Sequence, residues 1–399
     1  MRLFAKIASF TLVLTMLLTS IGCAKFSDDP YGSDSGSNSD SKYSSDASLD
    51  LDGTSGSSTS KATTKKETAQ KETTKKETTK TETSAAKKTF TLNTTNKWSY
   101  SQDSSNNVKV RTLNITTGWG GESVTIGQAS DLHINYCTSN DLKDPVLYST
   151  YQNRTWLKNG ASIPNVERCM QSLKNSDLVV ITGDLYDYYS EGVVLKTHEY
   201  VFGKYNNVVA CLGNHEFERQ MQGTVTDSKT LDERRFLVQA SWKNDIEYAS
   251  YIVKNKVMAI LLDNSTGDFL ESQYEKFKAD LETARNNGYV VLIFYHIPLD
   301  TGNPEYARVE PSYDKSGAIA YLYGTSLIGP SSTGINKKMY DLICNNGDVI
   351  KGCFSGHYHN DYYTEMLAKT PYGTSTIIPQ YILTSGALDQ GHILKIVVT

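Results

Sequence analysis

The stretch LVVITGDLYD, residues Leu178–Asp187, decides the fold class of this chain. It begins with a short run of aliphatic and β-branched residues and continues with Gly183 and two acids, Asp184 and Asp187. An apolar run of this length that stops at a turn residue predicts a strand buried on both faces. The acids that follow would then lie at the carboxyl end of that strand, which is where α/β sheets bind their ligands.

Runs of the same kind recur on both sides of this stretch. Buried strands are predicted at Val124–Ala129, Val208–Leu212, Val257–Leu262, Tyr289–Tyr295, Val349–Phe354, Pro379–Thr384 and Ile393–Val398. Amphipathic helices are predicted at Pro164–Asn175, Glu271–Asn286 and Asn336–Cys344. Continuous apolar strands that alternate with amphipathic helices predict a layered α/β fold.

Metal-binding side chains follow five of the predicted strands. The candidate ligands are Asp131, His133, Asp184, Asn214, His296, His357 and His359. Carboxylate, imidazole and amide groups suit Mn, Fe and Zn. Seven donors exceed the four of one tetrahedral site, and a carboxylate can bridge two ions, so the pattern predicts two metals.

The local spacing suggests how these side chains reach one place. Residues i and i+2 of an extended segment point the same way, so Asp131 with His133, and His357 with His359, would each offer two donors on one side. A glycine stands directly before three of the candidate ligands and would let the backbone turn sharply off each strand.

The ordered pattern D-x-H, G-D-x-x-D, G-N-H-E, H and G-H-x-H resembles that of the calcineurin-like metallophosphoesterase superfamily, over Val124 to about Thr399. The resemblance implies a four-layer α/β/β/α sandwich of two mixed sheets flanked by helices, with the metal site at the carboxyl ends of the strands. It also implies hydrolysis of a phosphoester by two metals, about 3.5–4 Å apart, that share a hydroxide.

The resemblance assigns a role to each motif residue. Asp131, His133 and His359 would hold the first metal, Asn214, His296 and His357 would hold the second, and Asp184 would bridge them. His215 matches a histidine that binds no metal and that protonates the leaving oxygen or stabilises the transferring phosphoryl group. Asp187 matches the acid that orients this histidine. Glu216 is expected to be a structural partner.

One departure from the family pattern bears on the substrate. In the protein-phosphatase branch an Arg-Gly pair follows the second Asp, and that arginine binds phosphate. Here Tyr188 and Tyr189 follow Asp187, so a protein phosphatase is not expected, and Arg219 or another group would have to take the role. The segments Leu261–Asn264 and Phe294–Pro298 are more similar to the branch that contains cyclic-nucleotide phosphodiesterases and related bacterial hydrolases.

Two features near the motifs allow two interpretations each. Tyrosines are frequent in the motif loops, at Tyr186, Tyr188, Tyr189, Tyr295, Tyr358, Tyr362 and Tyr363. They could form a wall that stacks on a base or sugar, or they could be core residues, which is the interpretation we prefer. The long insert Asp300–Thr333 follows the ligand His296 closely and could cover the site.

The N-terminal part predicts export. Residues 1–23 combine Arg2 and Lys6 with an apolar run too short for a comfortable membrane span, which is typical of a signal peptide. The run ends in Ser20-Ile-Gly-Cys23, which resembles a bacterial lipobox except for Ser20. We expect lipidation of Cys23 and a lipid-anchored protein that faces the cell exterior, with ordinary signal cleavage as the alternative.

Residues 24–88 are rich in Ser, Thr, Lys and Glu and are expected to form a disordered linker. As a coil of ~60 residues it would hold the domain, residues 89–399, on the order of 45 Å from its anchor. The net charge of −4 predicts no nucleic-acid surface, and the only membrane contact expected is through the lipid. The sequence indicates no protein partner.

The cysteines and the overall function each leave an alternative. Cys344 and Cys353 are the nearest cysteine pair in the domain, but burial as small apolar residues is the preferred interpretation. The predicted function is hydrolysis of a small, nucleotide-like phosphodiester or phosphomonoester outside the cell. The alternative is a non-catalytic, metal-dependent binding lipoprotein, but such a protein would have no need of His215.

Overall fold

The computed structural model describes residues 91–92, 99–117, 121–154, 160–217, 230–301, 328–388 and 390–399. They belong to one compact unit, Ala86–Thr399. The predicted signal peptide and linker lie outside the described residues, and so do Arg219 and most of the insert Asp300–Thr333.

The first sheet contains the strand on which the fold prediction rests. Its strands are β1 (Thr91–Leu92), β2 (Ser99–Asp103), β3 (Val108–Thr116), β4 (Val124–Ala129), β5 (Leu178–Thr182), β6 (Val208–Cys211) and β13 (His392–Val398). Their order is β1-β3-β13-β4-β5-β6, and β2 pairs with β3. The pairs β4–β5 and β5–β6 are parallel, whereas β13 runs antiparallel to β4, so the sheet is mixed.

The second sheet is also mixed. Its strands are β7 (Tyr248–Val253), β8 (Val257–Leu262), β9 (Val290–Phe294), β10 (Ile350–Ser355), β11 (Tyr362–Lys369) and β12 (Ser375–Ile382), in the order β11-β12-β10-β9-β8-β7. The four central strands are parallel, and β7 and β11 pair antiparallel at the two edges. Parallel neighbours bring their carboxyl ends to the same edge of the sheet.

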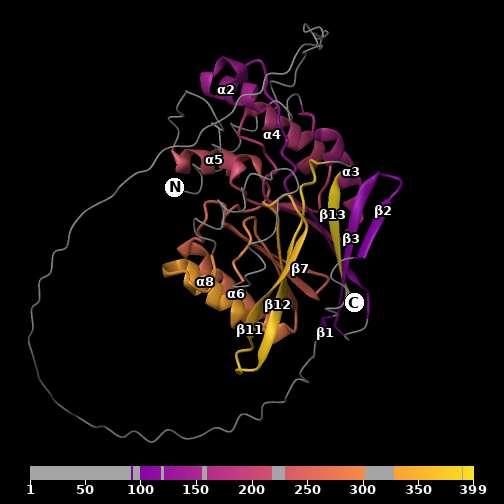
Figure 1. Cartoon of the computed structure of the whole chain (residues 1–399), viewed down its shortest axis with the longest axis vertical. Coiled ribbons are helices and arrows are strands. Elements are labelled where there is room, and N and C mark those ends of the chain that lie inside the picture. Colours follow the sequence, from indigo (N-terminus) through magenta and orange to yellow (C-terminus); the bar gives the residue numbers. More distant parts are fainter. Residues whose placement is uncertain are drawn as a thin grey trace, which may run out of the picture. The chain divides into compact units, whose positions relative to one another are not determined.

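Helices cover the outer face of each sheet. They are α2 (Pro145–Asn153), α3 (Ile163–Leu173), α4 (Glu191–Thr197), α5 (Leu231–Ser241), α6 (Glu271–Asn287) and α8 (Gly334–Cys344), with the short helical segments η1 (Asp141–Lys143), η3 (His198–Phe202) and η4 (His215–Phe217). Figure 1 shows α6 and α8 side by side next to the second sheet, away from α3 and α4. Helix α5 starts at a capping box made by Thr230 and Glu233, and α6 ends at Gly288, which has a left-handed φ of 70°.

Alternation along the strands produces three apolar layers. In β5, Val179 and Ile181 pack towards the helices that cover the first sheet, whereas Leu178 and Val180 face the second sheet. In β9, Ile293 likewise packs towards the cover of α6 and α8, and its neighbours face the first sheet. Because both faces of these strands are buried, they contain no polar alternation, and the order of layers is the predicted α/β/β/α sandwich.

Every strand and helix predicted from the sequence is present, with its ends shifted by a few residues. Strands β1, β2, β3, β7 and β11 and helices α2, α4 and α5 were not predicted, because they are partly exposed or short and lack the continuous apolar run on which the strand predictions relied. The five cysteines of the described part are free, so Cys344 and Cys353 form no disulfide, and Cys169, Cys211 and Cys353 are buried as small apolar side chains.

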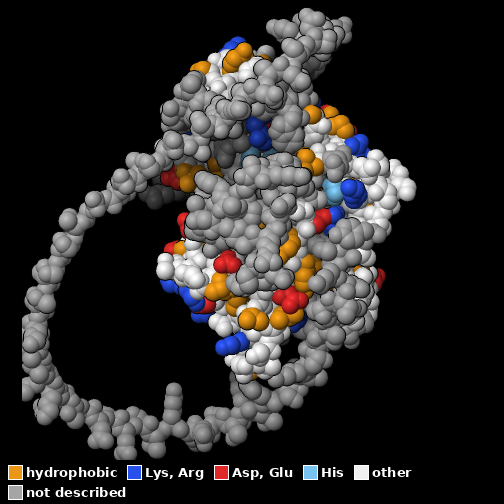
Figure 2. All heavy atoms as spheres, viewed as in Figure 1, with side chains coloured by type: hydrophobic (Ala, Val, Ile, Leu, Met, Phe, Trp, Pro, Cys, Tyr) orange, Lys and Arg blue, Asp and Glu red, His pale blue; other side chains and the backbone are white. Residues whose placement is uncertain are grey.

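The surface of the described part is mixed in character. In the space-filling view, acidic and basic side chains are interspersed with apolar ones over the described part of this face (Figure 2). Among the described helices, none has the length and apolarity required to cross a membrane.

The core between the two sheets should account for much of the stability. We expect Leu292→Ala, which removes a fully buried side chain from the layer between the sheets, to lower the free energy of unfolding by about 2–5 kcal/mol in urea titrations. The matched control is Leu367→Ala on β11, where the side chain is 83% exposed and the change should be below about 0.5 kcal/mol. Equal effects of the two substitutions would contradict this layer order.

Candidate metal centre

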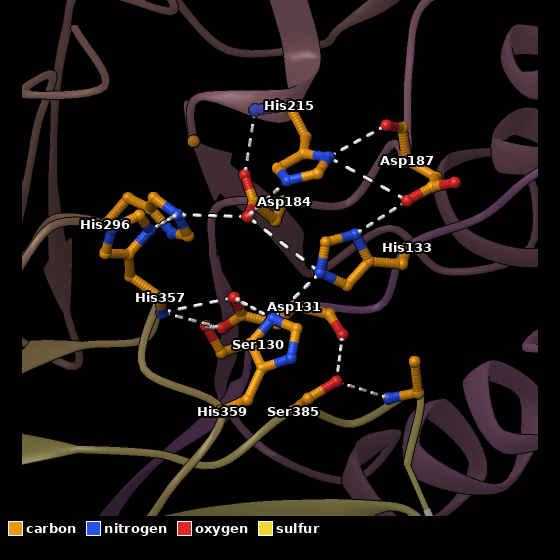
Figure 3. Close-up of polar contacts among 12 residues, drawn as sticks. Ser130, Asp131, His133, Asp184, Asp187, His215, His296, His357, His359 and Ser385 are labelled. Atoms are coloured by element: carbon orange, nitrogen blue, oxygen red, sulfur yellow. Dashed lines mark hydrogen bonds and ion pairs between the residues drawn. The ribbon is translucent and has the colours of Figure 1, made fainter. Parts of the chain in front are cut away.

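The seven predicted ligands follow the carboxyl ends of five strands, and Figure 3 shows that six of them, all except Asn214, converge on one place. The loops after β4 and β5 run together, since Asp131 N donates to Gly183 O at 3.1 Å and His133 N donates to Asp184 O at 2.9 Å. The loop after β10 is joined to the loop after β9 by Gly356 N, which donates to His296 O at 3.1 Å. Main-chain bonds between loops therefore fix the positions from which the side chains project.

The backbone of these loops is left-handed rather than extended. Five predicted ligands have positive φ: Asp131 (52°), His133 (42°), Asp184 (48°), His357 (73°) and His359 (50°). The other three such non-glycine residues among those described are Asn107, Lys254 and Asn255, all in turns. The extended backbone predicted for the pair Asp131 and His133 and for the pair His357 and His359 is therefore wrong. Left-handed backbone is unfavourable for these residues, and it is typical of sites where packing enforces a functional geometry.

The glycines before the ligands are needed mainly for close packing. A Cβ at Gly213 would overlap Asp184, and a Cβ at Gly356 would overlap Ser130 and Asp131. Of the three glycines, only Gly183 has positive φ, at 83°. The sharp turn predicted from the sequence is therefore present at Gly183, whereas Gly213 and Gly356 allow neighbouring loops to approach each other.

The first group of donors consists of Asp131, His133, Asp184 and His359, whose ligand atoms all lie within 4.8 Å of one another. His359 Nε2 is 3.0 Å from His133 Nε2 and 3.1 Å from Asp131 Oδ1. Asp184 Oδ2 lies 3.9 Å from His133 Nε2. All four residues are buried, so these polar groups converge in the interior of the protein.

The second group consists of Asp184, His296 and His357, again within 4.8 Å. His296 Nε2 lies 3.2 Å from Asp184 Oδ2 and 3.1 Å from His357 Nδ1. Asn214 Oδ1 is buried and has no hydrogen-bond partner among the described residues. Asp184 belongs to both groups, as expected of a bridging ligand.

The separations between donors fit metal coordination. Two ligand atoms at about 2.1 Å from one ion are roughly 3.0–3.4 Å apart at octahedral to tetrahedral angles. Four contacts within the two groups, from 3.0 to 3.2 Å, match this range, whereas the 3.9 Å between Asp184 Oδ2 and His133 Nε2 is longer. Asn214 directly follows Gly213, which packs against Asp184, and its buried amide oxygen has no hydrogen-bond partner in the described part of the chain, so it is available as a further ligand. The residues present therefore fit a dinuclear metal centre.

The comparisons with known proteins agree with this geometry. The family model described as calcineurin-like phosphoesterase matches residues 124–361. This chain belongs to the calcineurin-like phosphoesterase family. It is a metallophosphoesterase, and its chemistry is metal-dependent hydrolysis of a phosphoester. Among the curated proteins, none matches the sequence.

Similar solved structures have low sequence identity. A dimetal phosphatase from Danio rerio is 12% identical, with 66% of this chain and 88% of that chain covered and a TM-score of 0.40. A purple acid phosphatase from yellow lupin (Lupinus luteus) seeds is 12% identical, with 72% and 46% covered and a TM-score of 0.39. The calcineurin-like phosphoesterase YfkN from Bacillus subtilis is 15% identical, with 66% and 82% covered and a TM-score of 0.31.

Surrounding groups hold the ligands of the phosphoesterase in place. Asp131 Oδ2 accepts from Ser130 Oγ at 2.5 Å and from His357 N at 3.0 Å. His296 Nδ1 lies 2.8 Å from Thr182 O, which leaves its Nε2 for the centre. Such outer contacts fix the orientation and tautomer of metal-binding side chains.

The charges within the site favour the metal-binding state at Asp131 and His357 but not at His296. Burial lowers the pKa of His296, but the charge of Asp184 outweighs that effect and raises it to about 10. Burial raises the pKa of Asp131, but His359 and His296 outweigh that effect and hold it at about 2. Burial lowers the pKa of His357 to about 3, with a further contribution from His296. Ionised carboxylates and neutral imidazoles are the forms that coordinate metals.

Asp187 lies outside the two groups that share Asp184 and forms a third cluster of possible metal ligands with His133 and His215 (Figure 3). Its Oδ1 is 3.2 Å from His133 Nδ1 and 3.8 Å from His215 Nδ1. His215 Nδ1 is closer, at 2.9 Å, to the main-chain oxygen of Asp187. The acid therefore meets His215 mainly through its carbonyl group, and its carboxylate lies closer to the predicted ligand His133.

Sequence reasoning missed two residues next to Asp187. Arg154 Nε donates to Asp187 Oδ2 at 2.9 Å, and Asn135 Nδ2 donates to the same oxygen at 2.8 Å. Asn135 follows the D-x-H motif by two residues and could have been considered. Arg154 stands at the end of α2 with no motif around it, so only the fold could show it.

Glu216 has the structural role expected of it. Its carboxylate accepts from Gly213 N at 2.5 Å, Tyr186 N at 2.9 Å and Asp184 N at 3.1 Å. Burial and the charge of Asp184 raise the pKa of Glu216 to about 7, and the main-chain donors act in the opposite direction. This single side chain fastens the loop after β5 to the loop after β6.

The tyrosines near the motifs are mostly core residues. The fully buried ones are Tyr186, Tyr188, Tyr295 and Tyr358. Tyr189, Tyr362 and Tyr363 are half-buried. The core interpretation therefore holds for the four buried side chains, which cannot stack on a substrate.

Metal stoichiometry tests the division into two groups. We expect Asp184→Ala to bind neither metal tightly, because Asp184 belongs to both groups, whereas His359→Ala should lose only the first metal. Elemental analysis of the purified variants measures both effects. His198→Ala, at the start of η3, is the control and should retain two metals per chain. Retention of both metals by Asp184→Ala would contradict its bridging position.

Proposed function

We propose that this phosphoesterase hydrolyses a small, nucleotide-like phosphoester outside the cell, and that a phosphodiester is its preferred substrate. The observation that carries the proposal is the position of His215, which belongs to neither of the two groups that share Asp184 and clusters instead with His133 and Asp187. Its side chain is 15% exposed, whereas the neighbouring ligand His133 is 1% exposed. A partly exposed imidazole next to a metal centre is suited to transfer a proton to a bound ester.

The contacts of His215 define which nitrogen would act. Nδ1 lies 2.9 Å from the carbonyl oxygen of Asp187, so a proton on Nδ1 is held there. Nε2 then faces the centre, 3.9 Å from Asp184 Oδ2. The main chain of His215 is fixed as well, since its N donates to Asp184 Oδ1 at 3.0 Å. A protonated His215 could therefore donate from Nε2 to the leaving oxygen.

The preference for a diester rests on charge. A phosphomonoester dianion carries one more negative charge than a diester, and the protein-phosphatase branch places an arginine directly after the second Asp. Here that position is Tyr188, which is fully buried with its hydroxyl 3.1 Å from Asn135 Oδ1. This supports the phosphodiesterase-like branch over the protein-phosphatase branch.

The metals are proposed to be two of Mn, Fe or Zn, held by Asp131, His133 and His359 on one side and Asn214, His296 and His357 on the other, with Asp184 shared. When bound, such ions would activate water and neutralise phosphoryl oxygens. We further propose that the protein is exported, that it is cleaved near Cys23 or lipidated on it, and that residues 24–88 form a linker. They rest on the sequence alone.

Model substrates test the proposed function directly. Protein loaded with Mn, Zn or Fe should hydrolyse bis-p-nitrophenyl phosphate with a higher kcat/KM than p-nitrophenyl phosphate, because Tyr188 stands directly after Asp187 in place of the arginine that favours a dianion. Release of p-nitrophenol measures both rates. The reverse order would reject the diester preference. The absence of turnover with every metal, and with a panel of nucleotides, would instead favour a non-catalytic binding lipoprotein.

The role of His215 has its own test. We expect His215→Ala to keep two metals and to lower kcat by about 10²–10⁴-fold, the usual contribution of a general acid. Steady-state kinetics together with elemental analysis would measure the two properties on one sample. Unchanged turnover at full metal occupancy would remove His215 from the mechanism.

A further inference from the structure

One buried carboxylate lies between His133, a predicted metal ligand, and His215, the proposed general acid. Asp187 is 0% exposed, and its Oδ1 lies 3.2 Å from His133 Nδ1 and 3.8 Å from His215 Nδ1 (Figure 3). Arg154 contacts both oxygens of this carboxylate, through Nε at 2.9 Å and through Nη2. Asn135 completes the set at 2.8 Å. Two histidines with different roles therefore depend on the orientation of one acid.

The guanidinium group of Arg154 is what can fix that orientation. Its planar fork matches the two oxygens of a carboxylate and so defines the plane of the acid, not merely its charge. Burial raises the pKa of Asp187, but the contacts with His133 and Arg154 hold it below its ordinary value. Without the arginine, a buried carboxylate would lose its main neutralising partner and could rotate away from either imidazole.

Helix α2 and the turn before it fix the position of Arg154 beside Asp187. Helix α2 begins at Asp144, whose side chain accepts from Val146 N, and ends at Arg154, whose N donates to Thr150 O at 3.1 Å. The preceding turn is held by Asp141, which accepts from Glu191 N and from Gly192 N at 2.9 Å each. The guanidinium therefore lies at a defined place, with 19% of its side chain exposed.

Asn135, which donates to the same Asp187 oxygen as Arg154 Nε, is itself held by a chain of buried polar groups. Asn135 Oδ1 accepts from Tyr188 Oη at 3.1 Å, and Tyr188 Oη lies 3.2 Å from Cys137 Sγ. The tyrosine that replaces the family arginine thus points into the interior and supports Asn135. An arginine from a different part of the chain, Arg154, occupies the neighbourhood of the same acid.

We propose that Arg154 is a positioning residue of the phosphoesterase, which acts through Asp187 on both the first metal group and the acid His215. The contact between Asp187 and His133 concerns metal binding. The contact between Asp187 and His215 concerns catalysis and rests on the function proposed above. Loss of Arg154 should weaken the first metal and slow catalysis together, although Arg154 belongs to no ligand group.

Arg154→Ala tests the proposal with two readouts. We expect kcat for bis-p-nitrophenyl phosphate to fall by about 10- to 100-fold with KM within about threefold, and affinity for the first metal to fall by a similar factor, because outer partners of metal-binding histidines have effects of this size. Steady-state kinetics and titration of Mn or Zn against a chelator measure them. A rise in KM at constant kcat would mean that Arg154 binds substrate, and would overturn the proposal.

The chain offers a matched control in Arg285. Its Nε donates to Asp348 Oδ2 at 2.7 Å and its Nη2 to Asp348 Oδ1 at 3.1 Å, with side chains 24% and 19% exposed. Arg285→Ala breaks a two-point Arg–Asp pair at the end of α6 in which the arginine is about as exposed as Arg154, and kcat should stay within about twofold of wild type. An equal loss of activity in both variants would reduce Arg154 to a structural residue.

A double-mutant cycle tests whether Arg154 acts through the acid. In an Asp187→Asn background, Arg154→Ala should lower kcat by less than about twofold further, because both substitutions disable one carboxylate. Independent, multiplicative losses would contradict a shared path. Added guanidinium ion at low millimolar concentration should restore part of the activity of Arg154→Ala and none to Asp187→Asn.

Arg154→Lys covers the case in which the alanine variant does not fold. Lysine keeps the charge and most of the aliphatic stem but cannot make a planar two-point contact, so its metal affinity and kcat should stay within about threefold of the values expected for alanine. Wild-type values in this variant would reject the proposal. If wild-type protein turns over no ester, the proposed function fails. The chelator titration still tests whether Arg154 supports metal binding through Asp187 and His133.

Discussion

The carboxylate of Asp184 lies between two groups of imidazoles, with Oδ2 3.2 Å from His296 Nε2 and 3.9 Å from His133 Nε2. His296 follows a strand of the second sheet and His133 a strand of the first, so this one acid sits where the two sheets meet. Its main chain is fixed by Glu216, and its other oxygen accepts from His215 N at 3.0 Å. Any change that separates the sheets would therefore also divide the metal centre.

The centre depends on packing that compensates an unfavourable backbone. Five of the predicted ligands have left-handed φ angles, which cost of order 1–3 kcal/mol each where they are strained. The apolar layer between the sheets and the two layers under the helices supply the stabilisation that keeps these loops in place. Gly213 and Gly356 contribute by allowing loops to approach so closely that no Cβ fits.

Much of this arrangement could be predicted, and the exceptions have a common cause. The buried strands, the α/β/β/α layers and the strand ends that carry ligands follow from apolar runs and from the polar residues after them. The extended geometry assumed for Asp131 and His133 was wrong, because hydrogen bonds from their N atoms to the loop after β5 impose a different backbone. Periodicity contains no information about such contacts between loops.

The sequence by itself predicted which residues would carry the chemistry, since seven donors and His215 occur in family motifs at strand ends. It determined the fold class, since strands buried on both faces are continuously apolar. Only the tertiary structure decided how Asp187 is used. Its carboxylate is closer to His133 than to His215, and Arg154, which no motif marks, holds it from the end of α2. The physical reason is that a local sequence pattern shows only which residue types lie at a strand end. The partners of a buried charge depend on which distant segments the packed layers bring within hydrogen-bonding distance.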